Sequence, residues 1–110
     1  MEHISKPDLT AAINLLWARF LPDILERVAV LEAAAAAFAA DTLTIPQHEA
    51  ASDAAHKLAG SLGTFNLTRG TVLARELEVM YSRENGPDPA LGQQLISIAA
   101  ELRTIVENRN

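Results

Sequence analysis

The sequence predicts an all-α protein, an antiparallel four-helix bundle with a short additional helix at its N-terminus. Apolar residues recur at helical spacing along nearly the whole chain. Alternating runs of β-branched and aromatic residues are missing, and aromatics make up only 5% of the chain. Short breaks rich in proline, glycine and asparagine separate the helical stretches. Long amphipathic helices joined by such short links typically form an antiparallel bundle.

The first amphipathic stretch begins near Pro7 and carries Trp17 and Phe20, which we expect to close one end of the bundle. Pro22 then lies early in a second stretch that includes the alanine run 33–37. Proline is favourable in the first turn of a helix and bends a helix interior. Two alternatives follow: a new helix starts near Phe20, or one long helix bends there. We interpret the alanine run as a place where helices pack closely.

A third helix is expected from Pro46 to about Leu62, with Thr44 or Ile45 in the capping region. Gly63 should end or bend it.

The fourth helix is expected from about Leu67 to Tyr81, followed by the clearest loop of the chain at 82–87. Asp88 then caps a fifth helix, with Pro89 at its first position.

The length of 110 residues predicts one domain, residues 1–110. The 14 acidic against 9 basic side chains give a net charge of −5, which argues against nucleic-acid and anionic-membrane partners. The most hydrophobic stretch, 28–40, is shorter than the about 20 residues of a membrane span. The chain has no cysteine, and its N-terminus lacks the pattern of a signal peptide. We therefore expect a cytoplasmic protein.

The third helix contains a histidine and two glycines on one side. Gly60 lies about 40° and Gly63 about −20° around the helix from His56, at ~100° per residue. Glycine costs about 1 kcal/mol relative to alanine in a helix interior. A bare backbone beside an imidazole leaves room for another molecule to approach closely.

The apolar stripe of this helix lies on the face opposite His56. It comprises Ala51, Ala54, Leu58 and Leu62. Small or polar residues surround the histidine instead: Glu49, Ser52, Asp53, Ala59 and Gly60. This pattern predicts an exposed histidine on a docking surface rather than a histidine inside the core.

A neutral imidazole is a nucleophile at neutral pH, because histidine ordinarily titrates near pH 6.5. It can attack an electrophile such as phosphorus without a separate base. A phosphoryl group there would favour cationic neighbours, and the long side chain of Lys57 is a candidate, about 100° around the helix.

The segment 56–65, His-Lys-Leu-Ala-Gly-Ser-Leu-Gly-Thr-Phe, resembles the signature of the histidine-containing phosphotransfer (HPt) domains of two-component signalling. The segment 73–78, Leu-Ala-Arg-Glu-Leu-Glu, is similar to the downstream helix of that family. The Gly-Thr-Phe tripeptide is particularly similar to the phosphotransfer domains of chemotaxis-type kinases.

The resemblance implies that His56 is the phosphoacceptor, exchanging a phosphoryl group with an aspartate of response-regulator receiver domains. Gly60 would then give the receiver close access. The partners implied are receiver domains or a hybrid sensor kinase. No cofactor is expected on this chain, since Mg²⁺ would belong to the receiver. The sequence leaves open whether the chain is a complete protein or a domain of a larger sensor kinase, and a complete protein is the expectation that its ends favour.

Ala59 is the main departure from the family pattern, which usually places a lysine there to help hold the phosphoryl group. The lysine of this chain stands at position 57, on the other flank. We therefore expect a more labile phosphohistidine, or a partner that supplies the missing charge. Asn66 replaces a frequent glycine, with little expected effect because asparagine tolerates the left-handed conformation.

No ATP-binding motif is present, so the chain is not a kinase by itself. His48 and Ser52 are not expected to bind a metal, and Glu76 and Glu78 are interpreted as solvated helix charges. The alternative function is a non-catalytic interaction module that binds receiver domains or signalling partners without efficient transfer.

Overall fold

The computed structural model describes residues 6–83 and 87–109 of the chain. Their secondary structure is helical, with no strand among them, which confirms the all-α prediction. The elements are α1 (Lys6–Ala39), α2 (Ile45–Thr64), α3 (Thr68–Tyr81), a single 3₁₀ turn η1 (Pro89–Leu91) and α4 (Gly92–Glu107).

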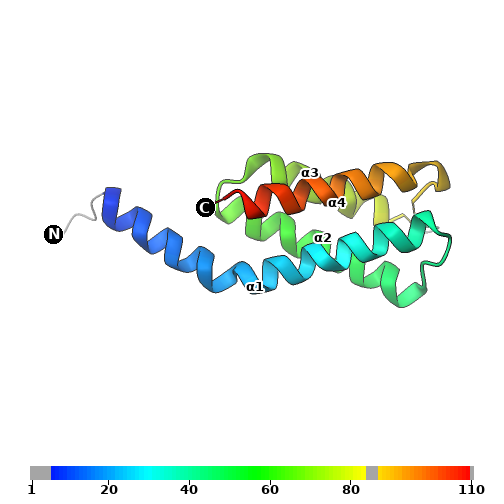
Figure 1. Ribbon diagram of the computed structural model, residues 1–110, viewed down its shortest axis with the longest axis horizontal. Helices are drawn as coiled ribbons and strands as arrows, with labels where there is room; N and C mark the ends of the chain where they lie inside the picture. Colours follow the sequence, from blue (N-terminus) through cyan, green and yellow to red (C-terminus); the bar gives the residue numbers. More distant parts are fainter. Residues whose placement is uncertain (1–5, 84–86, 110) are drawn as a thin grey trace.

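The four α-helices form a bundle in which each helix packs against two neighbours. α2 packs against α1 and α3, and α4 against the same two helices from the other side (Figure 1). Every helix turns one apolar stripe inward, as helical periodicity requires. The largest side chains with less than 2% exposure come from all four helices: Ile24, Val28, Leu31, Leu58, Leu62, Leu73, Leu77, Tyr81, Leu95, Leu102 and Val106.

The separate short N-terminal helix of the prediction is wrong, because α1 continues through Pro22 as one helix of 34 residues. An interior proline costs about 3 kcal/mol. Trp17 and Ile24 lie two turns apart on one stripe, one on each side of the proline, and both are buried. Burying each contributes about 1.5–3 kcal/mol, which offsets that cost. Figure 1 shows α1 changing direction midway, the expected consequence of a proline.

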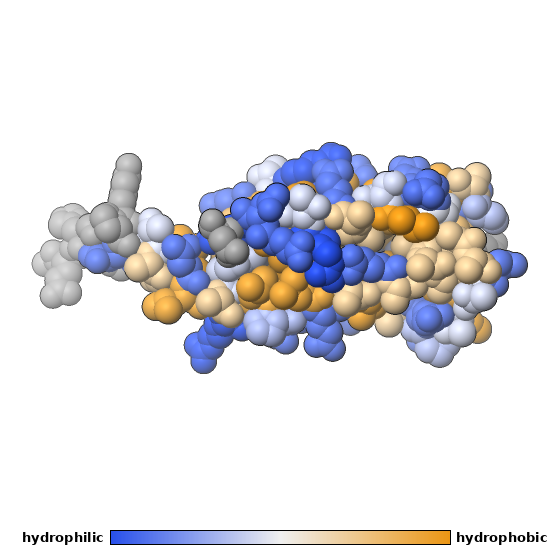
Figure 2. Space-filling model, in the orientation of Figure 1, coloured by the Kyte–Doolittle hydropathy of each residue, from blue (hydrophilic) through white to orange (hydrophobic). Residues whose placement is uncertain are grey.

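The N-terminal part of α1 extends beyond the bundle (Figure 1). Residues 8–16 are all exposed, and apolar side chains show on this projecting part in Figure 2. The bundle therefore begins at Trp17, which is only 3% exposed.

Trp17 closes this end of the bundle, as expected. Its ring meets that of Phe65 edge to face, with centroids 5.0 Å apart. The guanidinium of Arg109 lies 5.0 Å from the centre of the tryptophan ring and donates a hydrogen bond to Asn14. Phe20, half exposed, adds a second edge contact to Phe65. The end of α4 is thereby held against α1.

α2 begins at a complete capping box. The Thr44 side chain accepts a hydrogen bond from the backbone N–H of Gln47, and the Gln47 side chain accepts one from the backbone of Thr44. The helix passes Gly63 and ends at Thr64, slightly later than predicted. Asn66 then has φ 59°, the left-handed conformation that the sequence led us to expect it to tolerate.

The start of the last helix differs from the prediction. The Asp88 side chain caps as expected, accepting from the backbone N–H of Ala90 at 2.9 Å. Pro89, however, opens the 3₁₀ turn η1, and α4 begins only at Gly92. Of the predicted loop 82–87, residues 84–86 lie outside the described part.

Candidate functional site

His56 lies in the middle of α2 and points away from the core. Its side chain is 72% exposed. Leu58 and Leu62, on the opposite face of the same helix, are fully buried. The predicted orientation of the histidine is therefore the one the structure shows.

Glu78 of α3 contacts the imidazole directly. The Oε2 atom of Glu78 lies 2.6 Å from Nδ1 of His56. An ionised carboxylate can only accept, so Nδ1 must donate a proton in this contact. The lone pair of a neutral ring then lies on Nε2. The pairing of His56 with an ionised Glu78 thus favours one tautomer of the imidazole and holds the orientation of the ring.

The interpretation of Glu78 as a solvated charge is wrong. Its side chain is only 27% exposed and is engaged with His56. Positions 56 and 78 are 22 residues apart, on different helices, so neither spacing nor periodicity signals the contact. Only the register of α2 against α3 brings them together.

Gly60 and Gly63 leave the surface beside His56 open. Both residues are exposed. A Cβ atom added at Gly60 would meet no atom within 4 Å, and one at Gly63 would lie 3.7 Å from Oγ1 of Thr71. Neither glycine is required by packing, so the backbone is bare where another molecule can approach the imidazole.

Gly60→Ala is expected to raise the free energy of unfolding by about 0.5–1 kcal/mol, because alanine is the better helix former and the space is empty. Denaturant melts of the two proteins measure this. Gly70→Ala is the matched control. Its Cβ would lie 2.9 Å from Cδ1 of the buried Leu62, so no such gain is expected there. Equal effects at both positions would contradict the open geometry at Gly60.

The prediction that Ala59 lies on the exposed face around His56 is wrong. Ala59 is 2% exposed and forms part of the core. Ser52, on the same flank of α2, is half-buried. The flank is covered because α3 packs along it, as the His56–Glu78 contact shows. Of the small or polar residues predicted around His56, Glu49, Asp53 and Gly60 are exposed, and Gly63 adds to the open surface.

Lys57 and Asp53 pair with each other, with Nζ and Oδ2 2.9 Å apart and both side chains more than half exposed. They lie on the flank of α2 that faces α1, where they line a shallow hollow together with Glu26 and Arg27. The ammonium of Lys57 thus turns toward Asp53 rather than toward the imidazole. The expectation that Lys57 would serve the site directly finds no support in this geometry.

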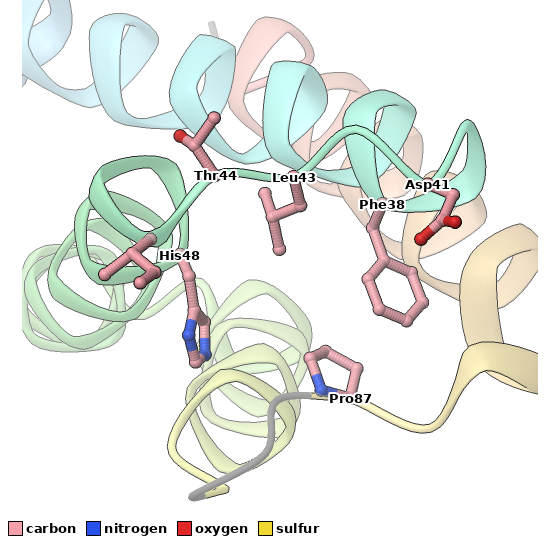
Figure 3. A pocket seen from close by; sticks show the side chains of 7 residues that line it. Phe38, Asp41, Leu43, Thr44, His48 and Pro87 are labelled. Carbon is pink, nitrogen blue, oxygen red and sulfur yellow. The ribbon is translucent and has the colours of Figure 1, made fainter.

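His48 lies nearer the other end of α2, where its Nε2 atom contacts the backbone carbonyl oxygen of Tyr81. Figure 3 shows its ring beside a hollow of about 220 Å³ that Phe38, Leu43 and Pro87 also line. Burial raises the pKa of Tyr81 to about 12, so its hydroxyl stays neutral at physiological pH. These groups are separate from the His56 surface.

Within residues 6–83 and 87–109, no group of three or more histidine or acidic side chains is arranged to hold a metal ion. None of the helices described is long and apolar enough to cross a membrane.

The sequence was compared with models of protein families and with known proteins. Residues 15–108 match the family model described as "Hpt domain". The chain is also similar to Protein RcaC of Microchaete diplosiphon, with 36% identity over 74 residues. That alignment covers 67% of this chain but only 11% of the relative, so the chain corresponds to a small part of it. No solved structure matches significantly.

Proposed function

The chain belongs to the Hpt domain family, and from that premise we propose that His56 reversibly exchanges a phosphoryl group with the aspartate of response-regulator receiver domains. Family membership supports a phosphotransfer role in two-component signalling. The observation that carries the assignment of the residue is the 2.6 Å contact between Nδ1 of His56 and Glu78, on an imidazole that is 72% exposed.

In the proposed transfer, the Nε2 lone pair of His56 attacks the phosphorus of an aspartyl phosphate. The N–P bond forms as the bond from phosphorus to the aspartyl oxygen breaks, and the electron pair leaves with the carboxylate. The ring then carries a positive charge, with its remaining proton on Nδ1. Glu78 accepts a hydrogen bond from that proton and stabilises the cation. In the reverse reaction an aspartate oxygen attacks phosphorus and the neutral imidazole leaves.

We propose that the receiver supplies the rest of the machinery, including Mg²⁺ and the acceptor aspartate. The bare surface at Gly60 and Gly63 supports this division, because it lets a second protein approach the ring closely.

The test is transfer between purified proteins. Potassium phosphoramidate can phosphorylate an exposed histidine directly, with ammonia as the leaving group. The phosphorylated protein is then mixed with Mg²⁺ and a panel of receiver domains, and label is followed on both. Transfer to a receiver aspartate supports the proposal. Binding to receivers without any transfer would favour the non-catalytic interaction module instead.

Glu78→Ala is expected to slow transfer about tenfold to a hundredfold, the loss of one hydrogen bond to a charged group. Single-turnover transfer rates measure it. The control is Glu76→Ala, an exposed carboxylate two residues earlier on α3. If the two variants transfer at equal rates while their melting temperatures match, Glu78 does not assist the imidazole.

A further inference from the structure

We propose that Arg75 binds the phosphoryl oxygens of phosphorylated His56. The inference rests on the proposed function, because it concerns the state in which His56 carries the group. In that state Arg75 would be the positively charged group that this chain itself supplies. The structure does not give this role to Lys57, which pairs with Asp53.

Two contacts fix the antiparallel register of α2 and α3. His56 lies against Glu78, at 2.6 Å. Seven residues further along α2, a Cβ at Gly63 would lie 3.7 Å from Thr71, which is seven residues before Glu78 on α3. Counting three residues from the first contact on each helix places Arg75 level with Ala59.

Arg75 lies one turn before Glu78 on α3, the helix that contacts the imidazole, and its side chain borders a hollow on the outer face of α3 with Val72 and Val79. It precedes Glu78 by three residues, which is about 4.5 Å along the helix axis and ~60° around it. It is exposed, as is His56. Ala59, level with Arg75 on α2, carries only a buried methyl group, so no long side chain from that position stands between Arg75 and α2.

Phosphorylation of His56 would bring a negatively charged group close to the carboxylate of Glu78, and the positive charge of Arg75 would offset the repulsion. The phosphoryl group carries up to two negative charges, and it would sit on the ring that Glu78 already contacts. A guanidinium matches phosphate oxygens with two parallel hydrogen bonds. A cation supplied by this chain itself is expected on α2 or α3, the helices joined by the His56–Glu78 contact.

The described basic side chains of these helices differ in how they are engaged. Lys57 pairs with Asp53, and Arg69 pairs with Glu101 at 2.8 Å. Arg75 forms no ion pair with any residue of the described ranges 6–83 and 87–109. Arg83 lies more than a turn beyond Glu78, on the side away from Gly60. Arg75 is therefore the basic side chain of these helices that lies one turn from Glu78 and has no ion-pair partner among the described residues.

The experiment measures the half-life of the phosphohistidine itself. Wild type and Arg75→Gln are phosphorylated with potassium phosphoramidate, freed of reagent, and followed by ³¹P NMR without any receiver. We expect the half-life to fall about tenfold in Arg75→Gln, the effect of one lost charge-assisted hydrogen bond. Arg75→Lys should recover most of it, because the charge remains.

Arg83→Gln is the matched control and should keep the wild-type half-life. Thermal melts of the unphosphorylated proteins establish that all variants fold. An unchanged half-life in Arg75→Gln, or an equal loss in both glutamine variants, overturns the inference. This readout uses no partner protein, so failure of transfer to receivers, which would overturn the proposed function, is observed separately.

Discussion

Replacing His56 with glutamine is expected to abolish phosphoryl acceptance while leaving the fold intact. The amide nitrogen of glutamine has no free lone pair, so no N–P bond can form. The amide can still donate a hydrogen bond to Glu78, and the side chain is 72% exposed in the wild type. The free energy of unfolding should therefore change by no more than about 0.5 kcal/mol. Labelling with phosphoramidate and a thermal melt together measure the two outcomes.

The control for this variant is His48→Gln, which removes the other histidine of α2. His48 contacts the backbone carbonyl of Tyr81 and lies away from the exposed surface around His56, so His48→Gln should still accept label. His56→Gln could instead be labelled to the same extent as the wild type, through a bond that is stable to alkali and labile to acid, as in phosphohistidine. That result would show that another histidine is the acceptor.

Leu58→Ala is expected to have the largest effect on stability, lowering the free energy of unfolding by about 2–5 kcal/mol. Leu58 is completely buried on the face of α2 opposite His56. Its truncation removes apolar burial and leaves a cavity in the core of the bundle. For a domain of this size, we expect the melting temperature to fall by about 10 °C or more.

Leu15→Ala is the matched control, the same substitution at a leucine that is 72% exposed on the projecting part of α1. Its effect should stay within about 0.5 kcal/mol. Urea melts of both variants measure the difference. Similar losses would mean that the projecting part of α1 is packed as tightly as the core. Below its lowered melting temperature, Leu58→Ala should still accept label, since His56, the proposed acceptor, is on the other face of α2.

The orientation of α2 was predictable because it depends on local periodicity alone. Leu58 and Leu62 are apolar at helical spacing, so the opposite face must hold His56 in solvent. The caps were predictable for the same reason: Thr44 and Asp88 act on backbone groups within three residues.

Features that depend on how the helices meet were not predictable. The continuity of α1 through Pro22 depends on burial energy gained on both sides of the proline. The burial of Ala59 and the role of Glu78 both depend on where α3 lies against α2. The direction of the Lys57 side chain was likewise not predictable, because its ammonium group pairs with Asp53 one turn earlier instead of extending toward His56.

The exposure of His56 has a kinetic consequence. A phosphoryl group on a ring that is 72% exposed meets water continuously, so its fate depends on two competing rates. One is hydrolysis, which is independent of any partner. The other is encounter with a receiver, which at a typical association constant of ~10⁶ M⁻¹s⁻¹ and about 1 μM receiver proceeds at ~1 s⁻¹. In the proposed function, signal reaches the receiver only while encounter outpaces hydrolysis, and receiver concentration thus sets the yield of the relay.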